Sequence, residues 1–287
     1  MILIDLNQVL LASVMTLLKQ QKDNSLDENL FRHMVLNSLR LHIKAFRKDY
    51  GEVVLCCDSQ KYWRRDVFSH YKAGRKKSRE KSDLDWSAIF GMLDIIRGEL
   101  KENFPYKVVN VEGAEADDVI GTLAPLYVAH ENVLIISSDG DFIQLQRYNK
   151  DNSKYKIAQY NPNLKKFIKS EDPNFDLKEK IIRGDKGDGI PNIYSPADCF
   201  VNEIRQKPIT KGIFDNLLKE DFSKWPNAVQ EGFLRNELLI DLSKIPHEIS
   251  TKIINTFDSI KPAPKQKMLT YFIEKKLKNL MDVIGEF

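Results

Sequence analysis

The sequence has few of the residues on which several kinds of site depend. Its three cysteines, Cys56, Cys57 and Cys199, show no Cys-x-x-Cys spacing. We expect the adjacent Cys56 and Cys57 to be reduced core residues, which fits a cytosolic compartment. Its five histidines are scattered along the chain. The sequence therefore indicates no nucleophile–histidine–acid triad, because such a triad needs a histidine beside its nucleophile.

Long apolar runs are also missing. No uninterrupted run is long enough to span a bilayer, so we expect no membrane association. The first residues are apolar, but they lack a basic region and include Asp5, which argues against a signal peptide. The sequence shows no internal repeats. A chain of 287 residues with these properties favours one large α/β domain and a smaller second domain.

Positive charge is concentrated in one stretch, although the formal net charge of the chain is only +3. Residues 61–81 interleave basic side chains with aromatic ones such as Tyr62 and Tyr71. A charged run is most often a solvated face, but aromatic and basic side chains together suit single-stranded nucleic acid, which offers bases for stacking and phosphates for pairing. We expect nucleic acid to contact Arg64, Arg65, Lys72, Arg75, Lys76, Lys77 and Arg79.

Short apolar runs alternate with segments of helical periodicity, which predicts an α/β fold with a mostly parallel central sheet flanked by helices. A polar loop is expected at Gln20–Asn29. Segments 154–160 and 165–169 predict a hairpin, and from Leu177 onward the pattern is mostly helical. Four buried strands are expected at Ile2–Ile4, Val53–Cys57, Tyr106–Val111 and Val133–Ser137.

Carboxylates follow all four expected strands. The ligand crevice of a parallel sheet lies at the carboxyl ends of its strands, so these side chains should gather there. Gathered carboxylates repel one another unless cations bind them, and hard oxygen ligands suit Mg²⁺ or Mn²⁺. One such cluster alone would more often be a helix cap or a turn, but the repetition favours a metal site. The residues concerned are Asp5, Asp58, Glu115, Asp117, Asp118, Asp139 and Asp141.

A further pair, Asp185 and Asp188, stands in the glycine-rich loop Arg183–Pro191. The whole set resembles the flap endonuclease family of structure-specific 5′ nucleases, and this resemblance covers essentially the whole chain. Where that family usually has a Gly-x-Gly-x-Lys hairpin that binds duplex DNA and potassium, this chain has Asn192–Pro196. The matching residues are Ile4-Asp5, Cys57-Asp58, Tyr71-Lys72 with Arg75, Glu115-Ala116-Asp117-Asp118, Ser138-Asp139-Gly140-Asp141, and Gly184-Asp185 with Asp188 and Ile190-Pro191.

The resemblance implies a PIN/5′-nuclease-like fold and two Mg²⁺ ions, for which Mn²⁺ would substitute. The first metal site would comprise Asp5, Asp58, Asp117 and Asp139, with Glu115 nearby. The second would comprise Asp141, Asp185 and Asp188, and Asp118 would support either site. Lys72 and Arg75 would grip the scissile phosphate, so the expected catalytic residues are Lys72, Arg75, Asp117 and Asp139.

The implied organisation is a catalytic α/β domain at residues 1–180, with a basic arch at about 61–90, and a helical DNA-binding domain at residues 181–287. The implied activity is a 5′-to-3′ exonuclease and flap endonuclease that removes RNA primers and adjacent DNA during lagging-strand replication. Its substrates would be 5′-flap or forked DNA and RNA–DNA duplex. Its partners would be a single-strand DNA-binding protein and a sliding clamp. We expect a monomer in the cytoplasm, that of the host cell if a phage encodes the chain.

Two other functions stay open from the residues alone. A PIN-type single-strand ribonuclease would share the sheet and the carboxylates, but it would not need the basic insertion or the residues after about Lys180. A non-catalytic DNA-junction binding protein would use the acidic residues only structurally. Metal-dependent cleavage of a labelled 5′-flap substrate distinguishes these functions from the nuclease.

Overall fold

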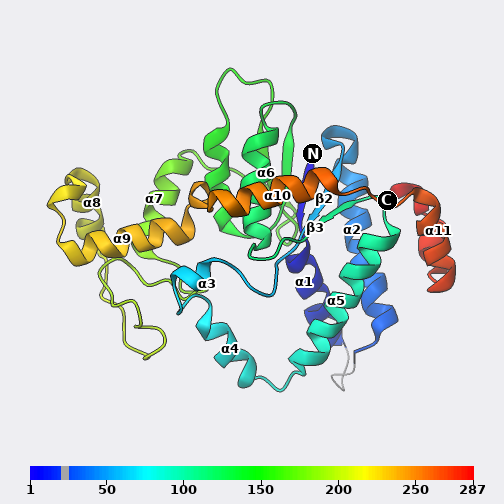
Figure 1. Ribbon diagram of the computed structural model, residues 1–287, viewed down its shortest axis with the longest axis horizontal. Coiled ribbons are helices and arrows are strands. Elements are labelled where there is room, and N and C mark those ends of the chain that lie inside the picture. Colours follow the sequence, from blue (N-terminus) through cyan, green and yellow to red (C-terminus); the bar gives the residue numbers. More distant parts are fainter. Residues whose placement is uncertain (21–25) are drawn as a thin grey trace.

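The computed structural model describes residues 1–20 and 26–287 of the chain (Figure 1). Residues 21–25 of the expected polar loop therefore lie outside the described residues. The helix after this loop begins at Glu28, because Asp27 caps it with hydrogen bonds from its side chain to the backbone. Within the described residues, no helix combines the length and the apolarity needed to cross a membrane.

In the described residues, a sheet of six strands forms the centre of the molecule, in the order β3-β2-β1-β4-β5-β6. All neighbouring strands run parallel except β6, which pairs antiparallel with β5 as the predicted hairpin. The four predicted strands and the hairpin are therefore confirmed. The strands are β1 (Ile2–Asp5), β2 (Val53–Cys56), β3 (Lys107–Val109), β4 (Val133–Ile136), β5 (Ile157–Asn161) and β6 (Lys166–Ile168).

Helices cover both faces of this sheet. Side chains alternate along β1, so that Ile2 and Ile4 belong to one hydrophobic cluster and Leu3 belongs to the other. The helices that contribute to the first cluster are α1 (Leu6–Gln20), α2 (Glu28–Tyr50) and α5 (Trp86–Asn103). Those that contribute to the second are α6 (Ala116–Tyr127) and α10 (His247–Ser259).

The C-terminal part is helical, which confirms the predicted fold class. The predicted boundary after residue 180 lies inside α7. Some C-terminal elements return to the sheet layers, because α10 packs against α6 and Phe287 packs against Phe104. The remaining helices are α7 (Pro173–Arg183), α8 (Lys211–Lys219), α9 (Asn227–Ile240), α11 (Lys265–Glu274) and α12 (Lys278–Met281). Short 3-10 helices are η1 (Gly140–Tyr148), η2 (Phe222–Lys224), η3 (Leu242–Lys244) and η4 (Ile284–Glu286).

The basic insertion forms an arc that leaves the body of the molecule and returns to it (Figure 1). It contains α3 (Arg64–Val67) and α4 (Ala73–Glu80), and it leads into α5. Helix α4 buries none of its side chains, so its basic residues are accessible to a ligand. A cavity of about 1210 Å³ lies between α1, α4 and α5.

Candidate active site

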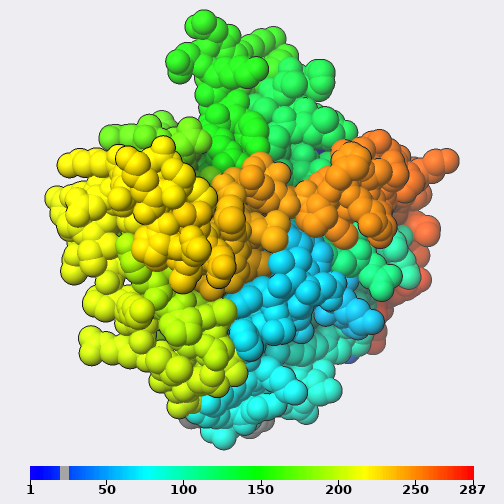
Figure 2. Space-filling model, turned by 60° about the vertical axis from the view of Figure 1, so that its left-hand side comes forward, coloured from blue at the N-terminus to red at the C-terminus, as the bar shows by residue number. Residues whose placement is uncertain are grey.

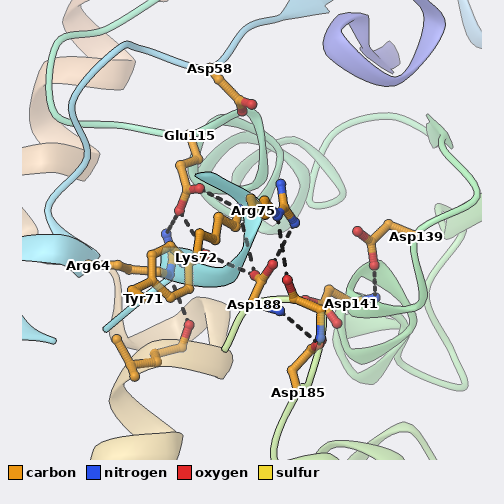
Figure 3. Close-up of polar contacts among 12 residues, drawn as sticks. Asp58, Arg64, Tyr71, Lys72, Arg75, Glu115, Asp139, Asp141, Asp185 and Asp188 are labelled. Carbon is orange, nitrogen blue, oxygen red and sulfur yellow. Dashed lines mark hydrogen bonds and ion pairs between the residues drawn. The ribbon is translucent and has the colours of Figure 1, made fainter. Parts of the chain in front are cut away.

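The carboxylates expected at the strand ends gather at one edge of the sheet, and we call the region between them the crevice. Asp5 ends β1, Asp58 follows β2, and Asp139 follows β4 and caps η1 by accepting a hydrogen bond from the backbone of Asp141. Asp117 lies in the first turn of α6. Figure 3 shows how six of the carboxylates surround the crevice, namely Asp58, Glu115, Asp139, Asp141, Asp185 and Asp188.

Asp5, Asp117 and Asp139 have raised pKa values, because burial and neighbouring negative charges disfavour their ionised form. Burial and the charge of Asp58 raise the pKa of Asp5 to about 7. Burial also raises the pKa of Asp117, although Lys72 opposes the rise, and desolvation raises the pKa of Asp139 against the effect of Lys180. Buried carboxylates with raised pKa values are poised to gain from a nearby cation. Their oxygen donors fit a hard divalent ion.

Three basic side chains lie among these carboxylates. The Lys72 ammonium is 2.6 Å from Glu115 Oε1 and 3.6 Å from Asp188 Oδ2. The Arg75 guanidinium donates to Asp188 Oδ1 at 2.6 Å. The two residues predicted to hold the scissile phosphate thus lie at the crevice, and in this structure they pair with its acids.

The third basic residue, Lys180, was missed in the sequence. Its ammonium pairs with Asp141 and lies 2.9 Å from Asp185 Oδ2. Lys180 lowers the pKa of Asp185, whose burial alone would raise it. The signal for this residue was weak, because a lysine in the last turn of a helix usually serves only the helix dipole.

The predicted metal ligands lie near one another, but their side chains are not arranged around a common position for an ion. Among the described residues, no three carboxylate, imidazole or thiolate groups converge closely enough to hold an ion. The assignment of these carboxylates to two metal sites stays a prediction, because their side chains are not turned toward a shared centre here. The physical reason is the basic residues, because Asp141 and Asp185 turn toward Lys180 while Asp188 turns toward Arg75.

Arg64 also corrects a prediction. Its side chain is only 3% exposed, and its guanidinium lies 2.7 Å from Asp118 Oδ1 and 3.0 Å from Glu115 Oε2. Its Nε donates to the backbone carbonyl of Leu239 at 2.9 Å. Arg64 is therefore a buried structural residue and not part of a nucleic-acid surface.

Asp118 belongs to the same buried network. It is fully buried, and it accepts hydrogen bonds from Trp63 Nε1, from Arg64 and from the backbone of Glu115. These contacts hold Arg64 and the start of α6, and the predicted supporting role of Asp118 at the metal sites stays a prediction. Glu115 is similarly enclosed, since one of its oxygens pairs with Lys72 and the other with Arg64.

The base of the arch is fastened to the loop that carries Asp185 and Asp188. The backbone of Lys72, which has a φ of 56°, donates to the carbonyl of Asp188 at 2.7 Å. The Tyr71 hydroxyl lies 2.9 Å from Asp188 Oδ2. Gly184 begins the loop with a φ of 73°, where a Cβ would lie 2.4 Å from the carbonyl oxygen of Ile190. The loop and the arch therefore form one packed unit, as their adjoining light-blue and yellow-green surfaces in Figure 2 show.

The remaining predicted nucleic-acid residues lie on the exposed side of the arch. Lys76 is 78% exposed, and Lys77, which pairs with Glu203, is 54% exposed. Arg65 and Arg79 line the cavity and lie over the rings of Tyr62 and Phe90. The four side chains extend the positive charge of the arch away from the carboxylates.

The comparison with known proteins covers the whole chain. A family described as "5′-3′ exonuclease, N-terminal resolvase-like domain" matches residues 1–172. A family described as "T4 RNase H, C terminal" matches residues 171–287. The first match alone includes more than half of the 287 residues.

Individual relatives and a solved structure indicate the same family as the two family matches. Ribonuclease H of Enterobacteria phage T4 is 32% identical over 297 aligned residues, which cover 99% of this chain and 95% of that protein. A 5′-3′ exonuclease of Mycoplasma genitalium is 27% identical over 98% of this chain and 97% of its own length. The structure of bacteriophage T5 D15 flap endonuclease, a pseudo-enzyme–product complex with DNA and metal ions, shares the fold with a TM-score of 0.63 and 18% identity, over 90% of this chain and 98% of that one. The predicted resemblance is confirmed, and the chain belongs to the family of 5′-3′ exonucleases and flap endonucleases.

Proposed function

We propose that this protein is a Mg²⁺-dependent 5′-to-3′ exonuclease and flap endonuclease that hydrolyses phosphodiesters near 5′ ends. The observation that carries the proposal is the position of the carboxylate crevice at the foot of a basic arch. A cavity lined by both acidic and basic residues can hold a polyanion beside the acids that would cut it.

Two divalent ions would fit the donor set, although side chains must turn to receive them. Asp5, Asp58, Asp117 and Asp139 would hold one ion, and Asp141, Asp185 and Asp188 would hold the other. Two bound ions supply an activated water and stabilise the negative charge that develops on the phosphate. Mn²⁺, which accepts the same oxygen ligands, would substitute for Mg²⁺.

The basic residues of the chain would orient the phosphate. Arg75 presents a planar fork that matches two phosphate oxygens, and Lys72 offers a compact positive charge. Asp188 and Glu115 raise the pKa of Lys72 against the effect of its burial, so the ammonium stays charged at neutral pH. Glu115 in turn is held by Arg64, which fixes the position of Lys72 relative to the crevice.

Cleavage of a 5′-labelled flap substrate in Mg²⁺, with EDTA as the control, tests the proposed function. We expect products cut at or near the junction only when the metal is present. Cleavage of single-stranded RNA without any duplex would instead support a PIN-type ribonuclease. Binding without cleavage in every metal tested would leave the junction-binding function.

Replacing Lys180 by Met is expected to tighten the binding of a divalent ion, because the ammonium competes for Asp141 and Asp185. Removing one such charge pair should lower the dissociation constant for Mg²⁺ by roughly tenfold. Calorimetric titration without substrate measures this directly. Lys178→Met, on the same helix, is the matched control, and an unchanged affinity in Lys180→Met would contradict the competition.

Replacing Arg79 by Ala is expected to weaken the binding of single-stranded DNA and leave the single-turnover rate at saturating substrate unchanged. Arg79 lies over Phe90 on the cavity wall and makes no contact with the carboxylates. Losing one phosphate contact should lower the slope of log affinity against log salt by about 0.7. Fluorescence anisotropy at several salt concentrations gives the slope, with Lys278→Ala as control. A slope equal to that of the unmodified protein would argue against the contact.

The biological setting extends the proposal. The substrates would be RNA primers and adjacent DNA at lagging-strand 5′ ends, presented as flaps, forks or RNA–DNA duplex. A single-strand DNA-binding protein and a sliding clamp are the partners we propose for a monomer that works in the cytoplasm.

A further inference from the structure

One arginine on the wall of the arch cavity has no assigned role. Arg97 lies on α5, across the cavity from the basic helix α4. Its NH2 group is 3.4 Å from Asn7 Oδ1, and it is close enough to Cys57 to oppose the effect of burial on the pKa of that thiol. Asn7 and Cys57 flank Asp5 and Asp58 in the sequence, so Arg97 lies beside the crevice.

The guanidinium of Arg97 has one buried nitrogen, Nε, and two terminal nitrogens that are weakly held. NH1 donates to Asp94, one turn earlier on the same helix, at 2.8 Å. Nε is buried and has no acceptor among the described residues, and the contact of NH2 with Asn7 is long. Nε is closed to solvent and the side chain lies near the buried Cys57, so the NH1–NH2 edge is the part of this side chain that remains for a ligand in the cavity.

The surroundings of that edge indicate an anion. Asp94 is 54% exposed, and an exposed pair one turn apart on a helix contributes little. The same cavity is lined by Arg65, Arg79 and Lys186, for none of which the described residues provide an ion pair. A planar NH1–NH2 edge binds two oxygens of one phosphate in parallel, which a lysine cannot do.

We propose that Arg97 binds a phosphodiester next to the scissile one, on the α5 side of the cavity, with Asn7 orienting its guanidinium. This inference rests on the proposed nuclease function, and it adds a second phosphate contact to the one proposed for Lys72 and Arg75. The basic arch holds the strand from one side, and Arg97 holds it from the other. The strand is then fixed across the carboxylate crevice rather than at one edge of it.

A structural role for Arg97 is the competing explanation, because the side chain also braces α5 against Asn7. The two roles differ in their dependence on substrate charge. A brace would affect all substrates equally, whereas a phosphate contact should matter only when the phosphate is charged. A single methylphosphonate linkage removes that charge and leaves the rest of the strand unchanged.

The experiment therefore compares oligonucleotides with one methylphosphonate at each linkage around the junction. For the unmodified protein, a methylphosphonate at one linkage beside the scissile phosphate should lower both the affinity and kcat/KM. Affinity is measured in EDTA and kcat/KM is measured in Mg²⁺. Arg97→Ala should lower both values for the charged substrate by roughly 10- to 100-fold, and it should show no further loss at that linkage. Arg97→Lys should recover part of the loss, while Lys101→Ala, on the exposed side of α5, should behave as the unmodified protein.

The outcomes separate this inference from the function on which it rests. If the unmodified protein does not cleave, the proposed function fails, but the binding measurements in EDTA still test Arg97. If Arg97→Ala keeps the full methylphosphonate penalty at every linkage, Arg97 is only a brace and the inference is overturned. Circular dichroism of each variant checks folding. If Arg97→Ala does not fold, Arg97→Lys is compared with the unmodified protein in its place.

Discussion

Asp139→Asn should abolish cleavage and leave DNA binding intact. Asp139 follows a buried strand and faces Asp5 and Asp117 across the crevice, so its charge is placed where a metal ion is needed. Asparagine keeps the oxygen that accepts from the backbone of Asp141, and the local turn should survive. The loss should be roughly three orders of magnitude, because one preorganised electrostatic contact is removed from the reacting centre.

Single-turnover cleavage of a 5′-flap substrate measures this loss, and anisotropy in EDTA measures binding. Removing a negative charge should leave affinity for the polyanion equal or slightly higher. Asp151→Asn, at an exposed turn before β5, is the control and should cleave normally. Turnover by Asp139→Asn within tenfold of the unmodified protein in Mg²⁺ would falsify the assignment of the crevice as the reacting centre.

Arg64→Ala should destabilise the protein, whereas Arg65→Ala should not. Removing the Arg64 guanidinium leaves Asp118 buried without its charged partner and leaves Glu115 paired with Lys72 alone. Breaking a buried pair in this way typically costs about 3–5 kcal/mol of unfolding free energy. Arg65 is exposed and contacts the ring of Tyr62, so its loss should change stability by less than about 0.5 kcal/mol and weaken nucleic-acid binding instead.

Urea unfolding of the two variants at several pH values gives the comparison. Burial raises the pKa of Asp118 already in the unmodified protein, and losing Arg64 should raise it further. A carboxyl group whose folded pKa exceeds its unfolded pKa binds more protons when folded, so it lowers stability as pH rises between the two values. The deficit of Arg64→Ala should therefore be smaller at pH 5 than at pH 8. Equal stability of the two variants at pH 8 would contradict the buried network.

The central sheet could be predicted because its strands are short apolar runs bounded by polar residues. The carboxylates could be placed at one edge from the same pattern, since parallel strands deliver their carboxyl ends together. The return of α10 to the sheet was not predictable, because its apolar residues fit a local helical bundle equally well. Its contacts with α6 join segments that lie far apart in the chain.

The basic residues were harder to assign than the acidic ones. Arg64 and Arg65 are neighbouring arginines on the four-residue helix α3. Their side chains point in different directions, so Arg64 is buried in the core and Arg65 lies at the surface. Lys180 had no motif of its own, and its position depends on how α7 packs beside η1. Charge pairs across distant segments are decided by tertiary packing, which a local pattern does not contain.

The sharing of Asp188 by the arch and the glycine-rich loop has a thermodynamic consequence. Arg75, Lys72 and Tyr71 all contact this carboxylate, so any cation that takes it over also releases the arch residues toward other anions. Ion binding at Asp188 and phosphate binding by the arch are then linked equilibria. Linkage is reciprocal, so whatever factor the ion adds to the affinity for the strand, the strand must add to the affinity for the ion.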